Sequence, residues 1–180
     1  MGKVGIVGLI CCSVSLTLIV VSTALPYWIQ YDEIQYEHYA RVSSGLWTLC
    51  RKENHQVEAD CQELSSVSEY FLAVRALVLM GLFMVASANV FGFIGTFVIR
   101  QRKNISLIAG VISISAGICM LTGAIVFAGR TSYLAKRTFV QYHVGFVLAI
   151  VAGVVGIVAG ILFICARRSE ENQTSSPLLH

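Results

Sequence analysis

Charged residues are scarce in this chain. Asp, Glu, Lys and Arg make up 13% of its 180 residues, whereas a soluble domain usually carries about 25%. Hydrophobic residues reach 56%, and the mean hydropathy is +0.74. A soluble fold of this length cannot hide so many apolar side chains, and the composition therefore excludes an ordinary soluble protein.

Charge is absent altogether from four windows of 22 to 24 residues: Val4–Leu25, Ala76–Ile99, Ile105–Ala128 and Val144–Ala166. As a helix, each window would be roughly 33–36 Å long, enough to cross a hydrocarbon core of about 30 Å. A cleaved signal peptide is the alternative interpretation of the first window, which is long for such a segment, since its apolar region normally has about 7–15 residues. We therefore predict one domain with spans at 4–25, 71–99, 105–128 and 144–166, outer loops at 26–70 and 129–143, and a cytosolic tail at 167–180.

Basic residues predict the orientation. Arg100, Arg102 and Lys103 lie in the short connection between the second and third spans, and Arg167 and Arg168 follow the fourth. Short loops rich in Lys and Arg stay on the cytosolic side of a membrane. We expect a multi-pass protein with both termini in the cytosol.

Catalytic motifs are missing as well. The four histidines, at positions 38, 55, 143 and 180, are scattered, and no glycine-rich phosphate loop or nucleophile elbow is present. Membrane enzymes and transporters place ionisable residues inside their helices, and the four windows contain none. We expect no enzymatic activity, no catalytic or metal-binding residue, no cofactor and no nucleic-acid partner.

Two of the six cysteines, Cys50 and Cys61, lie in the predicted outer loop. The outer face of a cell is oxidising, and two cysteines there predict a disulfide. Closing this loop would contribute about 3 kcal/mol in the chain-entropy model. A zinc site formed by Cys50, His55 and Cys61 is the alternative, but it lacks a fourth ligand and the usual Cys-x2-Cys spacing.

A further cysteine lies at the predicted cytosolic end of the fourth span. Cys165 is close to Arg167, where a thiol is open to palmitoylation. An inert thiol is the alternative interpretation.

Small residues recur in the last two spans. In lipid, glycines allow helices to approach closely. These glycines favour a compact four-helix bundle, but they are also compatible with a lateral interface between copies of the chain. The sequence does not distinguish the two interpretations. The glycines are Gly110, Gly117, Gly153, Gly156 and Gly160.

A motif precedes and includes the cysteine pair: Trp28, then Gly45-Leu46-Trp47 after sixteen residues, then Cys50 and Cys61. Together with "STALPYW" (22–28), and with "AVRAL" (73–77) around Arg75, this pattern resembles the claudin family, in the wider superfamily of peripheral myelin and epithelial membrane proteins. The resemblance covers about residues 4–166 in layout, and its motifs are concentrated in 22–77.

The resemblance implies a fold and a function. The fold is a left-handed bundle of four transmembrane helices with a small extracellular antiparallel β-sheet, which a strand near Thr138–Gln141 would join. The function is cis and trans self-association, with itself and related claudin-like proteins, at cell–cell junctions of the plasma membrane. Such a protein forms a paracellular barrier or an ion-selective pore and contacts membrane lipids.

Several features differ from the claudin pattern. The chain ends in Pro177-Leu178-Leu179-His180 rather than Tyr-Val, and we do not expect its C-terminus to bind PDZ scaffolds. The predicted second outer loop is short. The alternative is a short-tailed member of the lens fibre or epithelial membrane type, which acts in adhesion or membrane organisation without tight-junction strands. An auxiliary channel subunit is a further alternative.

Acidic residues outnumber basic ones eight to three between Pro26 and Arg75. In claudins, charges near the paired cysteines set ion selectivity, which makes Glu53, Asp60 and Glu63 candidates here. Negative charge favours cations. We expect a weak cation preference if a pore forms, with a merely solvated outer surface as the alternative.

Overall fold

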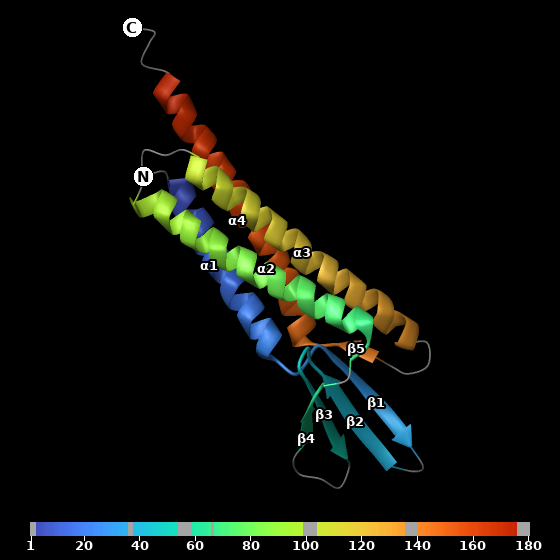
Figure 1. Cartoon of the computed structure of the whole chain (residues 1–180). Helices are drawn as coiled ribbons and strands as arrows, with labels where there is room; N and C mark the ends of the chain where they lie inside the picture. Colours follow the sequence, from blue (N-terminus) through green and yellow to red (C-terminus); the bar gives the residue numbers. More distant parts are fainter. Residues whose placement is uncertain are drawn as a thin grey trace.

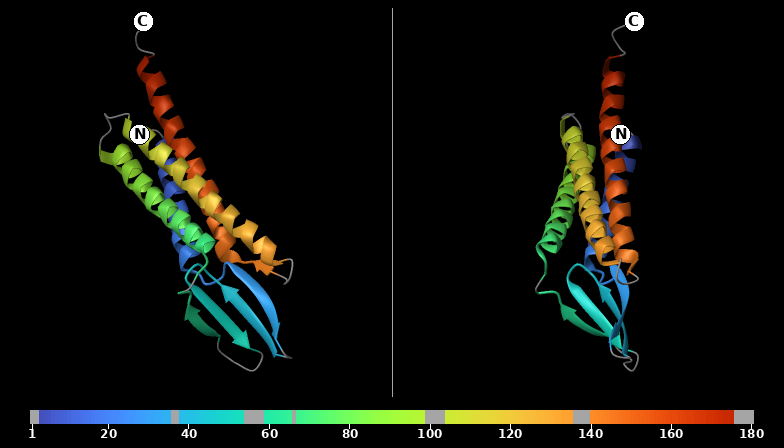
Figure 2. Two further views of the ribbon diagram at one scale, coloured as in Figure 1. Left: turned by 45° about the vertical axis from the view of Figure 1, so that its right-hand side comes forward. Right: turned by 90° about the vertical axis from the view of Figure 1, so that its right-hand side faces the viewer.

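The computed structural model describes residues 3–35, 38–53, 59–65, 67–98, 104–135 and 140–175. Four long helices run side by side, and a β-sheet stands at one end of them (Figure 1). The helices are α1 (Lys3–Ala24), α2 (Glu69–Phe93), α3 (Asn104–Ala135) and α4 (Val144–Ser175), and a π-helical turn, η1 (Ile94–Val98), extends α2. Helix α1 begins, and α4 ends, at the end opposite the sheet (Figure 2).

Many large apolar side chains lie on the outer surface of the bundle. Phe83 and Ile125 are 70% and 71% exposed, whereas small residues such as Ala116 and Ala152 are fully buried. An apolar exterior is unfavourable in water but suits lipid. All four helices are long and apolar enough to cross a membrane, with mean hydropathies of 2.2 to 3.0. The predicted four-helix membrane bundle is therefore confirmed.

Glycines bring α3 and α4 close together. A Cβ on Gly160 would lie 2.6 Å from the carbonyl oxygen of Gly110, and one on Gly117 would lie 2.6 Å from that of Gly153. A buried hydroxyl adds a hydrogen bond between the same helices, because Ser113 Oγ donates to the Gly156 carbonyl at 2.7 Å. These glycines therefore serve packing inside the bundle, the first of the two interpretations left open by the sequence.

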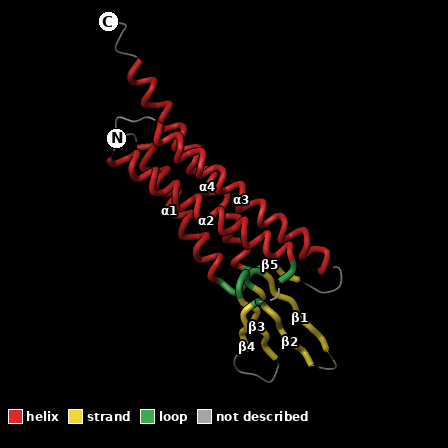
Figure 3. Tube along the Cα trace, viewed as in Figure 1, coloured by secondary structure: helices red, strands yellow, loops and turns green. Residues whose placement is uncertain are grey.

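The sheet is antiparallel and has the strand order β4-β3-β2-β1-β5 (Figure 3). Its strands are β1 (Ile29–Gln35), β2 (His38–Ser44), β3 (Thr48–Glu53), β4 (Asp60–Glu63) and β5 (Val140–Tyr142). β5 comes from the connection between α3 and α4 and pairs with β1. It ends at Tyr142, one residue beyond the predicted strand, whose first residues, 138 and 139, lie outside the described part of the chain.

Two helices are longer than the apolar windows suggest. α3 continues to Ala135 and α4 to Ser175, beyond the predicted ends at 128 and 166. No proline interrupts either extension, and Pro177 follows shortly after α4. Proline cannot continue a helix. The hydropathy windows thus predict the apolar part of each helix, and polar and charged residues continue the same helix beyond it.

Candidate functional site at the junction of sheet and bundle

Trp28 fills the centre of the junction between the sheet and the helices. Its side chain is 0% exposed, and its indole Nε1 donates a hydrogen bond to the Ser22 carbonyl at 2.8 Å. The ring packs edge-on against Phe127 of α3 and Phe146 of α4, with centroid distances of 5.2 and 6.2 Å. A buried indole needs a partner for its N–H, and here the end of α1 supplies it. Trp28 thus joins three of the four helices.

Gly45 lies where the chain after β2 crosses the end of α1. A Cβ at this position would lie 2.6 Å from Pro26 Cα and 2.7 Å from the Leu25 carbonyl oxygen. Both atoms belong to the backbone and cannot rotate away. The backbone amide of Trp28 also donates to the Ser44 carbonyl at 2.9 Å. The glycine of the Gly-Leu-Trp motif is therefore required by a close approach of two backbone segments.

Gly145 has an equivalent role on the other side of Trp28. A Cβ here would lie 2.6 Å from Trp28 Cδ1. The Gly145 amide donates to the Tyr27 carbonyl at 2.8 Å, and its carbonyl accepts from Ser22 Oγ at 2.6 Å. The only signal in the sequence was a glycine at the start of the fourth apolar window.

Arg75 ties α2 to the loop that follows β2. Its Nε donates to the Leu46 carbonyl at 2.7 Å and its Nη2 to the Leu64 carbonyl at 3.1 Å. Its guanidinium also lies 4.8 Å from the ring centroid of Trp47 and 5.2 Å from that of Phe71. Cation–π contacts and two charge-assisted hydrogen bonds thus converge on a single side chain.

The two neighbours of Gly45 in the motif have different environments. Leu46 is 1% exposed, within the core, whereas Trp47 is 41% exposed and covers Arg75. Trp47 presents an amphipathic ring beside the end of the apolar helices, where tryptophan is favoured at the membrane interface. In this motif Gly45 therefore permits the close approach of two backbone segments, Leu46 packs in the core and Trp47 lies on the surface.

The disulfide between Cys50 and Cys61 is present in the structure. It joins β3 to the edge strand β4, in which the two cysteines are direct partners, with a Cα–Cα distance of 4.0 Å. Because both sulfur atoms are used in this bond, they leave no thiolate for the alternative zinc site. His55 lies outside the described residues, among which no group of three or more metal-ligating side chains is found.

The three candidate selectivity residues do not share one surface. Side chains alternate between the two faces along a strand, so the register places Glu53 and Asp60 on the face of Arg51 and Glu63 on the other. Arg51 lies within 3.7 Å of Glu53 and is the cross-strand partner of Asp60. All three carboxylates are exposed.

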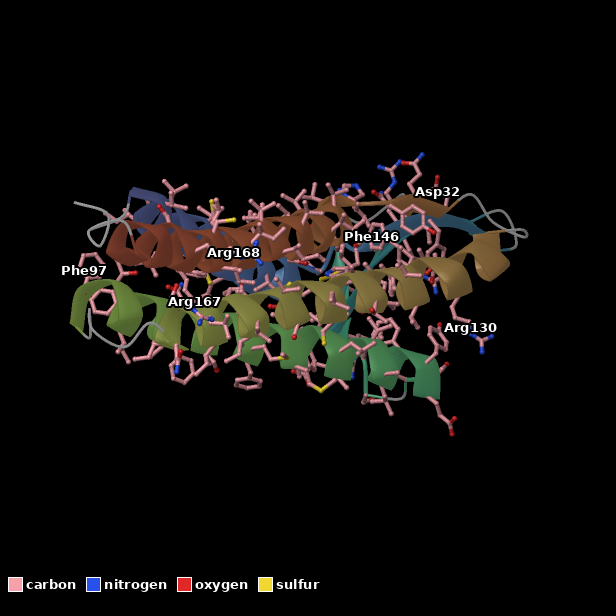
Figure 4. All side chains as sticks on the ribbon, turned by 90° about the horizontal axis from the view of Figure 1, so that it is seen from above. Asp32, Phe97, Arg130, Phe146, Arg167 and Arg168 are labelled. Atoms are coloured by element: carbon pink, nitrogen blue, oxygen red, sulfur yellow. A yellow bond between two sulfur atoms is a disulfide. The ribbon has the colours of Figure 1, made fainter. Side chains whose placement is uncertain are left out.

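Cys165 lies far from this junction, on the part of α4 toward the other end of the bundle. Its thiol is exposed. Arg167 and Arg168 follow it on the same helix (Figure 4). Acylation at Cys165 stays a prediction, which the exposure of the thiol permits.

Together these features define a class of protein. It is a multi-pass membrane protein whose first connection folds into a disulfide-closed sheet, joined to the bundle by a buried tryptophan and an arginine. A sequence model of the PMP-22/EMP/MP20/Claudin family matches residues 3–163. The chain belongs to this family. Comparison with curated proteins gives no match.

Proposed function

We propose that this protein acts at cell–cell junctions of the plasma membrane as a claudin-like barrier or ion-selective pore. It would associate in cis and in trans with itself and with related proteins. The observation that carries this proposal is the firm attachment of the sheet to the bundle, through Trp28 and Arg75. A sheet held at a fixed angle can present the same surface to a neighbouring cell in every copy.

The proposed orientation places the sheet outside the cell. The Cys50–Cys61 disulfide lies at the sheet end, where an oxidising environment would preserve it. Arg167 and Arg168 lie in the opposite half of the bundle (Figure 4), on the side where basic residues favour the cytosol. Both termini would then be cytosolic.

Strand formation is the first expected result. Fibroblasts without endogenous claudins that express this chain should show continuous intramembrane strands at their contacts in freeze-fracture microscopy. Surface biotinylation serves as the control, because it shows that the protein has been delivered. Normal delivery with only diffuse particles would contradict the proposal and favour the lens fibre or epithelial membrane type of function.

The charges beside the disulfide predict a second result. Dilution potentials across monolayers should show a weak preference for cations, and Asp60→Asn should reduce the cation-to-anion permeability ratio about twofold. A unit charge acting through water at about 8 Å shifts the energy of a monovalent ion by about 0.5 kcal/mol, and salt screening reduces this to about 0.2 kcal/mol. The shift has opposite signs for a cation and an anion, so the permeability ratio changes by about 0.4 kcal/mol, which is about twofold.

Glu63→Gln is the matched control for Asp60→Asn. It removes the same charge from the same short strand, but from the opposite face of the sheet. If the face shared with Arg51 lines the pathway, the control should have a smaller effect. Equal effects of the two variants, or a preference for anions in the unmodified protein, would contradict this assignment.

A further inference from the structure

A carboxamide lies on the lipid-facing side of the bundle, between α1 and α2. Asn89 Nδ2 donates a hydrogen bond to Ser13 Oγ at 3.1 Å, and Ser13 is exposed. Ser13 is nine residues after the start and eleven before the end of the span Val4–Ala24. The pair is therefore near the middle of the membrane, where water is absent.

The hydrogen bonds of Asn89 are incomplete. The single hydroxyl proton of Ser13 has two acceptors, the Leu9 carbonyl at 3.0 Å and Asn89 Oδ1 at 3.3 Å. A carboxamide offers two N–H donors and a carbonyl with two lone pairs. Within the described part of the chain, Ser13 is the only hydrogen-bond partner of this side chain. One N–H and much of the carbonyl capacity of this half-buried side chain therefore have no partner within the described part of the chain, which is unfavourable at this depth.

Other polar side chains on the lipid-facing surface do not share this problem. The hydroxyls of Ser87, Ser115 and Thr122 each donate to a carbonyl four residues earlier in their own helix, at 2.8–3.0 Å. A hydroxyl has a single hydrogen-bond donor, and these bonds satisfy it. Asn89 is thus distinguished from them by its spare donor and acceptor.

A groove lies next to the carboxamide on the surface of α1. Its volume is about 430 Å³, and its lining is apolar apart from two hydroxyls; the lining residues are Leu9, Ile10, Ser13, Val14, Thr17 and Leu18. Such a groove can receive the side chains of a neighbouring helix, which supplies the packing that drives association in lipid.

We propose that the α1–α2 face around Asn89 is the cis interface with a second copy of this chain. A two-fold axis along the membrane normal keeps both copies in one orientation and brings each residue to the depth of its counterpart. A carboxamide is self-complementary, because its N–H can donate to the carbonyl of an identical group. Two Asn89 side chains would satisfy each other across the axis. This inference rests on the proposed cis association and specifies its surface.

The test measures association of the full chain in isolated cells, before any contact forms. Single-molecule photobleaching at matched surface density gives the dimer fraction. Asn89→Leu should weaken association about fivefold or more, because an interhelical hydrogen bond in lipid contributes on that scale, while Asn89→Gln should retain most of it. Ser115→Ala is the matched control and should leave the dimer fraction unchanged, because that hydroxyl donates within its own helix.

Cross-linking provides a second, independent measurement. Asn89→Cys should give a disulfide-linked dimer on oxidation with copper phenanthroline, above the background of the unmodified chain, and Ser115→Cys should not. Asn89→Leu places an apolar side chain in lipid and should leave the Cys50–Cys61 disulfide and surface delivery intact.

Two results would overturn the proposal. They are an Asn89→Leu dimer fraction equal to that of the unmodified chain, and equal losses with Asn89→Leu and Ser115→Ala. If the first result came with reduced labelling of Asn89→Leu by a photoactivatable sterol, it would assign the face to a lipid hydroxyl. Absence of junctional strands would count against the proposed function alone, because these measurements require no cell contact.

Discussion

Trp28→Ala is expected to lower the free energy of unfolding by about 3–5 kcal/mol, the range for removing a large aromatic side chain from a core. The ring is fully buried and contacts Phe127 and Phe146 on two different helices. Those contacts would be replaced by a cavity at the point where sheet and bundle join. The Ser22 carbonyl would also lose the indole N–H as its partner.

The measurement is unfolding in detergent micelles, followed by the loss of helical circular dichroism. Trp47→Ala is the matched control, because it deletes the same side chain from a position that is 41% exposed. That variant should lose mainly its cation–π contact with Arg75, about 0.5–1 kcal/mol. Similar losses in both variants would contradict the assignment of Trp28 as the centre of the junction.

Trp28 and Trp47 show which features of the fold could be predicted from the sequence and which could not. Hydropathy predicted four spans, and the motif around Trp28, Gly45 and the cysteines indicated the family. The two tryptophans of that motif nevertheless differ in environment, because Trp47 is 41% exposed and Trp28 is fully buried. Trp28 is enclosed by Phe127 of α3 and Phe146 of α4, which are about a hundred positions away along the chain. No local pattern distinguishes the two environments, because burial depends on these distant segments.

The acidic residues beside the disulfide are a second feature that the sequence predicted only in part. The sequence places Glu53, Asp60 and Glu63 within three positions of a cysteine. Only the β3–β4 register shows that Glu63 lies on the opposite face from the other two. A shift of one residue in that register would exchange the faces. The pairing of Cys50 with Cys61 as direct partners fixes the register, so a single covalent bond determines which charges act together.

The sequence alone did not distinguish the glycines that are required for close packing from the others. Gly145 packs against Trp28 as closely as Gly45 packs against the end of α1, yet it is one of fifteen glycines in the chain. A glycine needed for close approach and one that faces open space look alike in the sequence. Gly129, on α3, is of the second kind, because an added Cβ would meet nothing within 4 Å. The structure thus supplies a pair of positions whose substitution separates the two cases.

Gly45→Ala is expected to lower the free energy of unfolding by about 3 kcal/mol, the upper part of the range for overpacking. The new methyl group would lie 2.6 Å from Pro26 Cα and 2.7 Å from the Leu25 carbonyl oxygen. A side chain in that place could change rotamer, but these backbone atoms can move only if the end of α1 moves. That movement would disturb the hydrogen bond from the Trp28 amide to the Ser44 carbonyl.

Gly129→Ala is the matched control for this substitution. It should be neutral, or stabilising by up to about 1 kcal/mol, because alanine is the better helix former and the space is open. Adding Pro26→Ala to Gly45→Ala should not restore stability, since the close contact involves the Cα atom that every residue has. Rescue by that second substitution would show that the proline ring, rather than the crossing of two backbones, is what requires glycine at position 45.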